Sequence, residues 1–287
     1  YTSKKFISIF SLGYKSYKLN KIDVNDKDFK ANLQNWPIKG LYQPDAIVFL
    51  PYKKTLLDRL LNNYYFASAN EGDSKVYENM SEEVRVKDIK IDREKINNFF
   101  KVKEGLSRLK VSKIDADKNN DGKFESLYTF GGRSFSVWKY FPGYKIFGYK
   151  LLKDKVTLHY DSRDEFEKIL SKDYIDNYNT HYSKTKKKLI FDKRSDDKGP
   201  EPESLSLFRL EQSLYLIISL ERSNGFFIYD ITDLKYIKYV TFFPITEKFF
   251  SPEGIKIYYS KKNILLLVSF EKSGSIVFYR ILKKNDV

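Results

Sequence analysis

An acidic loop over residues 115–125 has the residue types and spacing of a calcium ligand set. Oxygen-bearing side chains stand at alternate positions before Gly122, and a glutamate follows three residues after that glycine. Ca²⁺ takes roughly six to eight oxygen ligands, and alternation in a tight loop can turn such side chains toward one centre. The match to an EF-hand loop is partial, because Tyr128 stands where the bidentate glutamate would be; a metal-free Asx-turn loop is the alternative. The predicted ligands are Asp115, Asp117, Asn119, Asp121 and Glu125.

Carboxylates at the ends of repeated strands form a second candidate site. An acidic residue opens the first strand of each of three repeats, and another closes the second strand. If the repeats are equivalent, these side chains meet at one mouth of a central channel. Crowded like charges raise each other's pKa and cost stability, so they require a metal or basic partners. The alternative is a structural ion-pair network between repeats. The candidate residues of this channel-mouth site are Asp45, Glu71, Asp73, Arg133, Arg194, Glu201, Glu203, Glu221, Glu253 and Glu271.

Basic side chains near this site allow two interpretations. They could neutralise the carboxylates, or they could hold a phosphate group beside a bound metal. No catalytic residue is predicted, because the chain has no cysteine, its two histidines lack evident partners, and no glycine-rich loop precedes a helix. The sequence therefore leaves enzymatic activity open and favours a protein that is not an enzyme. The basic residues are Arg133, Arg194, Lys198 and Arg222.

The elements that must position these residues are repeated strands. Residues 202–231 align without a gap to residues 252–281, at a constant offset of 50. Each copy contains short apolar strands separated by turn residues. A similar unit opens at Pro44, with an inserted stretch around residues 56–61. Strand-only repeats of about 50 residues are typical of β-propeller blades. The sequence therefore predicts an all-β fold, a β-propeller with short helical insertions.

The remaining segments suggest one propeller domain over residues 1–287, or the C-terminal half of one. Residues 81–108 have helical spacing and are expected to leave the blade as an excursion, with a helix starting at Ser81. Another blade is expected between residues 124 and 160, and a long polar loop over residues 171–199. These segments predict about four blades and a fragment.

Composition limits the class of partner. The net charge is +14, but the lysines are scattered and only residues 184–188 form a compact run, so nucleic-acid binding is not predicted. No stretch approaches the roughly 20 apolar residues of a membrane span, so membrane association would be indirect. The absence of cysteine excludes disulfides within the chain.

Four segments carry a resemblance to a known family. They are residues 42–46 (YQPDA), 69–73 (ANEGD), 132–138 (GRSFSVW) and 194–203 (RSDDKGPEPE). They resemble the choice-of-anchor I proteins, which include mesenchyme-specific cell-surface glycoproteins and bacterial secreted proteins sometimes labelled alkaline phosphatases. The resemblance covers most of the chain. It implies a secreted or surface-anchored propeller of roughly twice this length, of which this chain is similar to the C-terminal half.

These observations predict a calcium-binding propeller, secreted or on the extracellular face of a membrane, that acts as an interaction or assembly scaffold. Its expected partners are other protein chains, including the N-terminal half of the same propeller. One alternative is a calcium-dependent phosphoesterase that uses the channel carboxylates. Another is binding to mineral or acidic surfaces, which the net charge and the resemblance both suggest.

Overall fold

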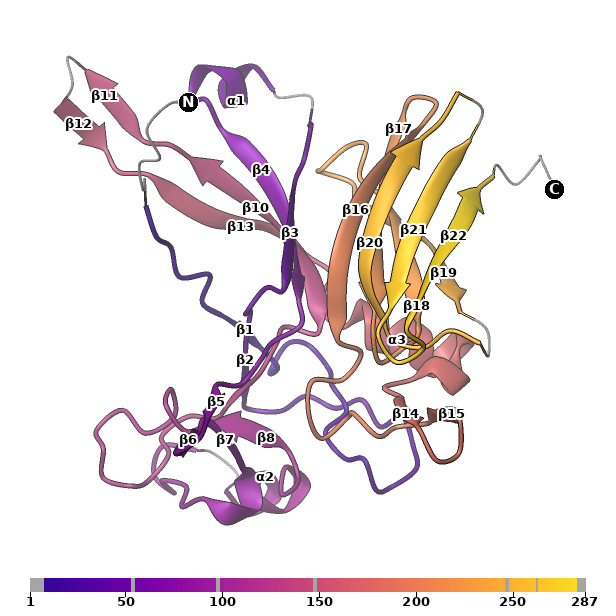
Figure 1. Ribbon diagram of the computed structural model, residues 1–287. Helices are drawn as coiled ribbons and strands as arrows, with labels where there is room; N and C mark the ends of the chain where they lie inside the picture. The colour runs from indigo at the N-terminus through magenta and orange to yellow at the C-terminus, as the bar shows by residue number, and fades with distance from the viewer. Residues whose placement is uncertain are drawn as a thin grey trace.

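The computed structural model describes residues 8–52, 55–96, 99–146, 149–245, 248–261 and 263–282. Three antiparallel sheets stand side by side, and a smaller lobe lies below the first of them (Figure 1). We call the three sheets the first, middle and last blades. The fold is mostly β, with propeller-like blades and few helices, as the sequence predicts.

The first blade combines strands that are far apart in the sequence. Its order is β13-β10-β4-β3, and β10 pairs with β4 from Ser134↔Asn70 to Tyr140↔Tyr64. A short helix, α1 (Leu56–Leu60), fills the predicted insertion between its first two strands. The strands are β3 (Ala46–Phe49), β4 (Tyr64–Asn70), β10 (Ser134–Phe141) and β13 (Lys155–Asp161).

The expected blade between residues 124 and 160 is therefore wrong as a separate unit. Its strands β10 and β13 complete the first blade instead, so the described residues form three blades rather than about four. The pairing is long-range, and a local sequence pattern contains no signal for it. The short strand β9 (Tyr128–Thr129) pairs elsewhere, with β2 (Lys39–Leu41), which in turn pairs with β1 (Tyr14–Ser16).

The middle and last blades confirm the 50-residue repeat. Their registers agree, because Leu216↔Tyr229 in the middle blade recurs as Leu266↔Tyr279 in the last. The middle blade has four strands, in the order β16 (Pro202–Leu210), β17 (Ser213–Leu220), β18 (Gly225–Asp230) and β19 (Lys238–Pro244). The last blade has three, in the order β20 (Pro252–Tyr259), β21 (Ile264–Phe270) and β22 (Ser275–Ile281).

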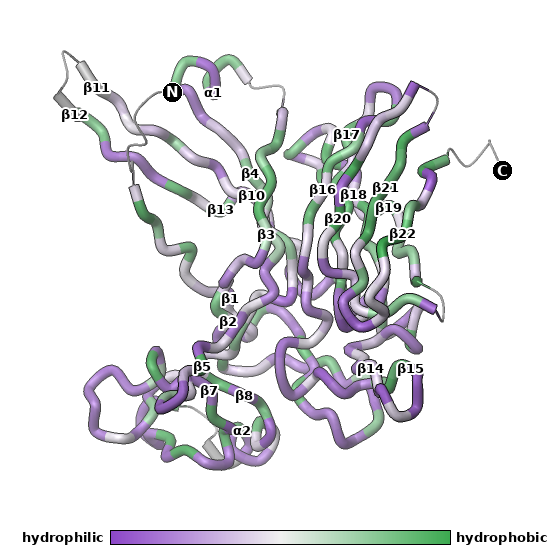
Figure 2. The backbone as a smooth tube through the Cα atoms, in the orientation of Figure 1, coloured by the Kyte–Doolittle hydropathy of each residue, from purple (hydrophilic) through white to green (hydrophobic). Residues whose placement is uncertain are grey.

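Two hydrophobic clusters join the blades, and their apolar strands are visible in Figure 2. Between the first and middle blades, the rings of Phe135 and Tyr229 lie 4.7 Å apart. Between the middle and last blades, Phe226 packs in one cluster with Leu266 and Phe270. The first strands of adjacent blades are also in contact, β3 with β16 and β16 with β20. Strand ends of all three blades therefore lie close together.

The lower lobe has its own hydrophobic core, in which Trp36 packs with Val102 and Leu106. Only part of the expected helical excursion is helical. Ser81 lies in a strand and starts no helix, so that prediction is wrong; the alternating residues around it pair as hairpins. The lobe contains β5 (Val76–Tyr77), β6 (Met80–Ser81), β7 (Glu83–Arg85), η1 (Val86–Asp88), α2 (Phe99–Gly105) and β8 (Lys110–Ser112).

The chain leaves the first blade for this lobe and returns to it at one point. Gly72 and Gly131 both have positive φ, and a Cβ on Gly72 would lie 2.0 Å from the Gly131 nitrogen. Only glycine permits such an approach. The Gly132 N–H then donates to the Asn70 carbonyl, which restarts the pairing of β10 with β4.

The remaining elements are short. The stretch expected as a long polar loop over residues 171–199 contains the end of a helix and a hairpin. None of the helices in the described ranges is long and apolar enough to cross a membrane. These elements are β11 (Tyr144–Ile146), β12 (Tyr149–Leu152), α3 (Glu165–Asp173), η2 (Ile175–Asn177), β14 (His181–Ser183) and β15 (Lys188–Ile190).

Candidate functional site

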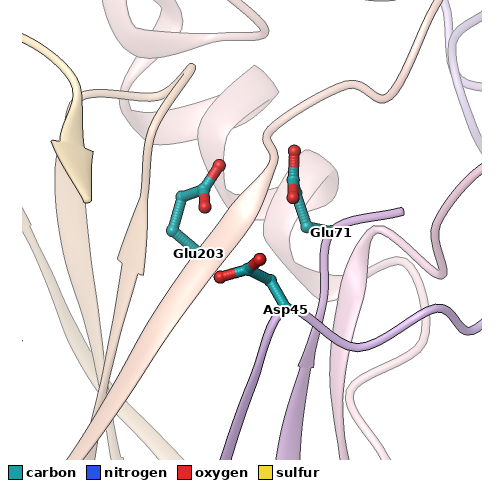
Figure 3. Close-up of side chains that lie close together, drawn as sticks. All are labelled: Asp45, Glu71 and Glu203. Atoms are coloured by element: carbon teal, nitrogen blue, oxygen red, sulfur yellow. The ribbon is translucent and has the colours of Figure 1, made fainter. Parts of the chain in front are cut away.

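The strand ends bring three carboxylates of two blades together. Asp45 precedes β3, Glu71 follows β4, and Glu203 lies near the start of β16. One carboxylate oxygen from each lies within 4.8 Å of the other two. Figure 3 shows their side chains around a common space between the first and middle blades. We call Asp45, Glu71 and Glu203 the carboxylate trio.

The same backbone feature, a residue with positive φ followed by a β-bulge, orients acidic side chains at two equivalent places in the repeat. Glu201 and Ser251, which are equivalent at the offset of 50, both have positive φ, of 50° and 61°. A register shift follows each of them, at the start of β16 and of β20. Such a bulge re-aims the side chains next to it. Glu203 and Glu253 stand within these bulges, so both are turned toward the blade junctions.

The predicted set of strand-end carboxylates is brought together beyond the trio. Glu201, Glu203 and Glu221 form a second group within 4.8 Å, and Glu221, Glu253 and Glu271 form a third. The three groups share members and make a continuous row across the three blades. Asp73 stands at the rim, with its carboxylate 3.9 Å from the Lys198 ammonium and its side chain mostly exposed.

The negative charge of the Glu201 carboxylate is fully compensated by neighbouring cations. Arg194 donates from Nε at 2.7 Å and Nη2 at 2.5 Å, and Arg222 donates from Nε at 3.0 Å. The Lys198 ammonium lies 3.8 Å from the other side of the same carboxylate. Burial alone would raise the pKa of Glu201, but these cations lower it to about 2. This part of the row is the ion-pair network that the sequence left as an alternative.

Glu203, two residues further on, has different surroundings. Its side chain is buried, and among the described residues no cation or hydrogen-bond donor contacts its carboxylate. Burial, Glu71 and Glu253 raise the pKa of Glu203 to about 10. Glu71 pairs with Lys198, yet burial still raises the pKa of Glu71 to about 7.

Arg133 does not join the strand-end row. It is fully buried, and its Nη1 donates to a Glu167 oxygen at 3.0 Å and to the Asp23 carbonyl at 2.8 Å. Its Nη2 donates to the carbonyls of Ser195 and Asp197. These donors already bond to other parts of the protein, so Arg133 holds segments of the fold together and is not placed as a phosphate ligand. Sequence reasoning missed Glu167, because it lies 34 residues away on α3 and no local motif marks it.

The acidic loop has three carboxylates in reach of one point. Oxygens of Asp117, Asp121 and Glu125 lie within 4.8 Å of one another. The Asn119 side-chain oxygen accepts from the Asp121 N–H at 3.0 Å, so Asn119 stands in the same turn. Asp115 is apart from the group, because its carboxylate accepts from the Ser112 hydroxyl at 3.1 Å.

Backbone conformation in the acidic loop follows its sequence. Asn120 and Gly122 have positive φ, of 58° and 80°. Asn and Gly are the residues that adopt this region most readily. The Gly122 N–H donates to Asp117 at 2.9 Å, which folds the loop back on its first carboxylate. The loop is exposed, so an ion could reach these oxygens from solvent.

Two comparisons relate this chain to known proteins. The family model of the choice-of-anchor I domain matches residues 1–234. Among curated proteins, Gigasin-3a of Magallana gigas is 31% identical over 126 residues, which is 43% of this chain. The matched region spans 39% of that relative's length. This chain therefore belongs to the choice-of-anchor I family of cell-surface or secreted proteins.

Proposed function

We propose that this chain is a calcium-binding assembly module of a surface protein, and that its open blade faces bind further propeller blades. The observation that carries the proposal is a contrast between equivalent positions of the repeat. Positions that are buried between neighbouring blades are exposed at both ends of the row of three blades.

At the last blade, the outward face has no cover among the described residues. Phe226 of β18 is 2% exposed because the last blade packs on it, whereas Ile276, its equivalent in β22, is 69% exposed. The same holds for Phe208, which is buried, and its exposed equivalent Tyr258. Neighbouring Phe278 is also exposed.

At the first blade, the opposite face is likewise left open by the residues that the structure describes. Leu205 pairs with Ile218 in the middle blade and is 8% exposed, packed toward the first blade. Its equivalent Ile47 lies two residues after the strand-opening carboxylate, as Leu205 does, and is 65% exposed. Phe49 on the same strand is exposed as well.

The occupant we propose for both faces is another blade of the same repeat, carried by other polypeptide. The contacts inside the chain define its chemistry, since each internal blade covers these positions with aliphatic and aromatic side chains of an antiparallel sheet. Large exposed apolar patches mark interaction sites. The relative matched here is also considerably longer than the matched region.

Site-specific photocross-linking in the native surface protein tests this assignment. A benzoylphenylalanine at Phe278 would stand on the open face, and one at Tyr236, an exposed aromatic residue between β18 and β19, is the matched control. We expect Phe278 to cross-link to a peptide with alternating apolar residues from a propeller strand, and Tyr236 not to do so. Cross-links to lipid, to a second copy of this chain, or equally from both positions would overturn the proposed occupant.

The calcium part of the proposal is supported by the acidic loop. Asp117→Asn removes one of three clustered carboxylates, and we expect it to weaken Ca²⁺ binding by about tenfold or more. Asp115→Asn is the control, because that carboxylate is held by Ser112 outside the group. Calorimetric titration of chelator-treated protein measures both. Equal affinity in Asp117→Asn and the parent would contradict the loop site.

A further inference from the structure

The carboxylate trio differs from an ordinary acidic surface cluster in one respect. Its innermost member, Glu203, is 5% exposed and has no hydrogen-bond or ion-pair partner among the described residues. The groups that face it are carboxylates, Asp45 and Glu71 on one side and Glu201 and Glu221 on the other. An ionised carboxylate buried without a partner costs several kcal/mol.

The nearby cations do not supply that partner. Arg194 and Arg222 are engaged with Glu201, and Arg222 also lies 2.9 Å from Glu221. Lys198 pairs with Glu71 and lies within 4.0 Å of Glu201, but it makes no contact with Glu203. Arg194, Lys198 and Arg222 therefore gather around Glu201, and the three carboxylates of the trio retain an excess of negative charge over Lys198, which pairs with one of them.

The spacing of the trio suits one shared ion. Two oxygens bound to the same Ca²⁺ at about 2.4 Å can be at most about 4.8 Å apart, and the trio oxygens lie within that limit. The ligands are all hard oxygens, without histidine or cysteine, which favours Ca²⁺ over Zn²⁺. Mg²⁺ suits the trio less well than Ca²⁺ does, because it requires a tighter octahedron of ligands and retains several of its bound waters. Asp45 is exposed, so the space communicates with solvent.

We propose that Asp45, Glu71 and Glu203 bind a divalent cation, Ca²⁺ by preference, which holds the first blade to the middle blade. Two of the ligands come from the ends of β3 and β4, and the third comes from β16. The ion gives Glu203 the positive partner that none of the described residues supplies. This site is separate from the acidic loop, and its test is independent of whether the open blade faces bind further blades.

Metal counting in a background without the loop site tests the proposal. Asp117→Asn protein is stripped with chelator, titrated with Ca²⁺ alone, and compared with the double variants Asp117→Asn/Glu203→Gln and Asp117→Asn/Glu253→Gln. Glu253 is the equivalent carboxylate of the last blade and lies outside the trio. We expect Glu203→Gln to abolish binding of about one ion per chain, and Glu253→Gln to retain it.

Asp45→Asn provides a second variant, because Asp45 is exposed and the loss of its charge leaves the fold intact. This variant should weaken Ca²⁺ binding without lowering the melting temperature measured in chelator. The melting temperature of the Asp117→Asn background should rise with Ca²⁺, and that rise should vanish with Glu203→Gln. Unchanged binding in both trio variants would overturn the site. Loss of binding in Glu253→Gln would move the ion to the last blade and overturn the assignment as well.

Discussion

The middle and last blades share one sequence repeat but differ in what covers them. The middle blade is packed on both faces, by the first blade on one side and the last blade on the other. Within the described part of the chain, the last blade is packed on one face only, and Ile276 and Phe278 of its other face are exposed. Their equivalents Phe226 and Ile228 carry similar apolar side chains. Burial in this array is therefore set by the neighbouring blade rather than by the strand's own sequence.

The largest expected difference concerns the equivalent residues Phe226 and Ile276. Phe226→Ala should lower the free energy of unfolding by about 3–5 kcal/mol, because it leaves a cavity between two blades. Ile276→Ala should change it by less than about 0.5 kcal/mol in the chain alone, because its side chain is exposed. Urea denaturation of both variants measures the difference. Similar losses in the two variants would break the comparison.

A smaller effect is expected from exchanging two equivalent turn residues, Asn224 directly before β18 and Gly274 directly before β22. Asn224 is buried, and its amide donates to the Phe249 carbonyl at 2.9 Å and accepts from the Ser251 N–H at 3.0 Å. Its equivalent is Gly274, around which a Cβ would meet nothing within 4 Å. Asn224→Gly should cost about 2 kcal/mol through unsatisfied buried groups.

The reciprocal change, Gly274→Asn, is the control. Asn tolerates the positive φ of 59° found there, so the free energy of unfolding should change by less than about 1 kcal/mol. Thermal melting of both variants shows which of the two substitutions destabilises the protein more. A larger loss for Gly274→Asn than for Asn224→Gly would contradict it.

The middle blade also differs in the expected pH dependence of its stability, because the connection that leads into it contains a buried acid. Burial raises the pKa of Asp192 to about 8, although the Ser195 hydroxyl donates to its carboxylate. In the unfolded protein, the pKa of an aspartate side chain is about 4. The protein should therefore lose stability as the pH rises from about 4 to about 8, since ionisation favours the unfolded state across that window.

Asp192→Asn should remove this loss, which we expect to be at least about 1.4 kcal/mol, the value of one pKa unit. Asn also suits the positive φ of 62° at this position. Melting temperatures at pH 5 and pH 9 measure the effect, with Asp73→Asn at an exposed carboxylate as the control. An unchanged pH dependence in Asp192→Asn would refute the assignment.

Local repetition made part of the fold predictable. The offset of 50 residues located the strands of the middle and last blades, and the stretch around residues 56–61 located α1. The number of blades was not predictable, because Ser134 pairs with Asn70 across the whole lobe and no short pattern records such a pairing. Similarly, residues 81–108 have helical spacing, but tertiary packing in the lobe turned most of them into hairpins and turns.

The candidate site was predictable in its carboxylates and less so in its cations. Equivalent repeat positions correctly suggested that Asp45, Glu71 and Glu203 converge. Arg133 was expected beside them, but its pairing with Glu167 depends on how α3 packs under the blades. Strand periodicity determines which residues reach a shared edge, whereas the partner of a buried charge depends on distant elements.

The contact between Gly72 and Gly131 has an evolutionary consequence. Because the chain departs and re-enters at the same point, the length of the segment between these residues can change without altering the strand register of the first blade. Insertions and deletions in the lobe are therefore compatible with an unchanged propeller. Substitution of either glycine is not, since a side chain would separate the two strands that the contact holds together.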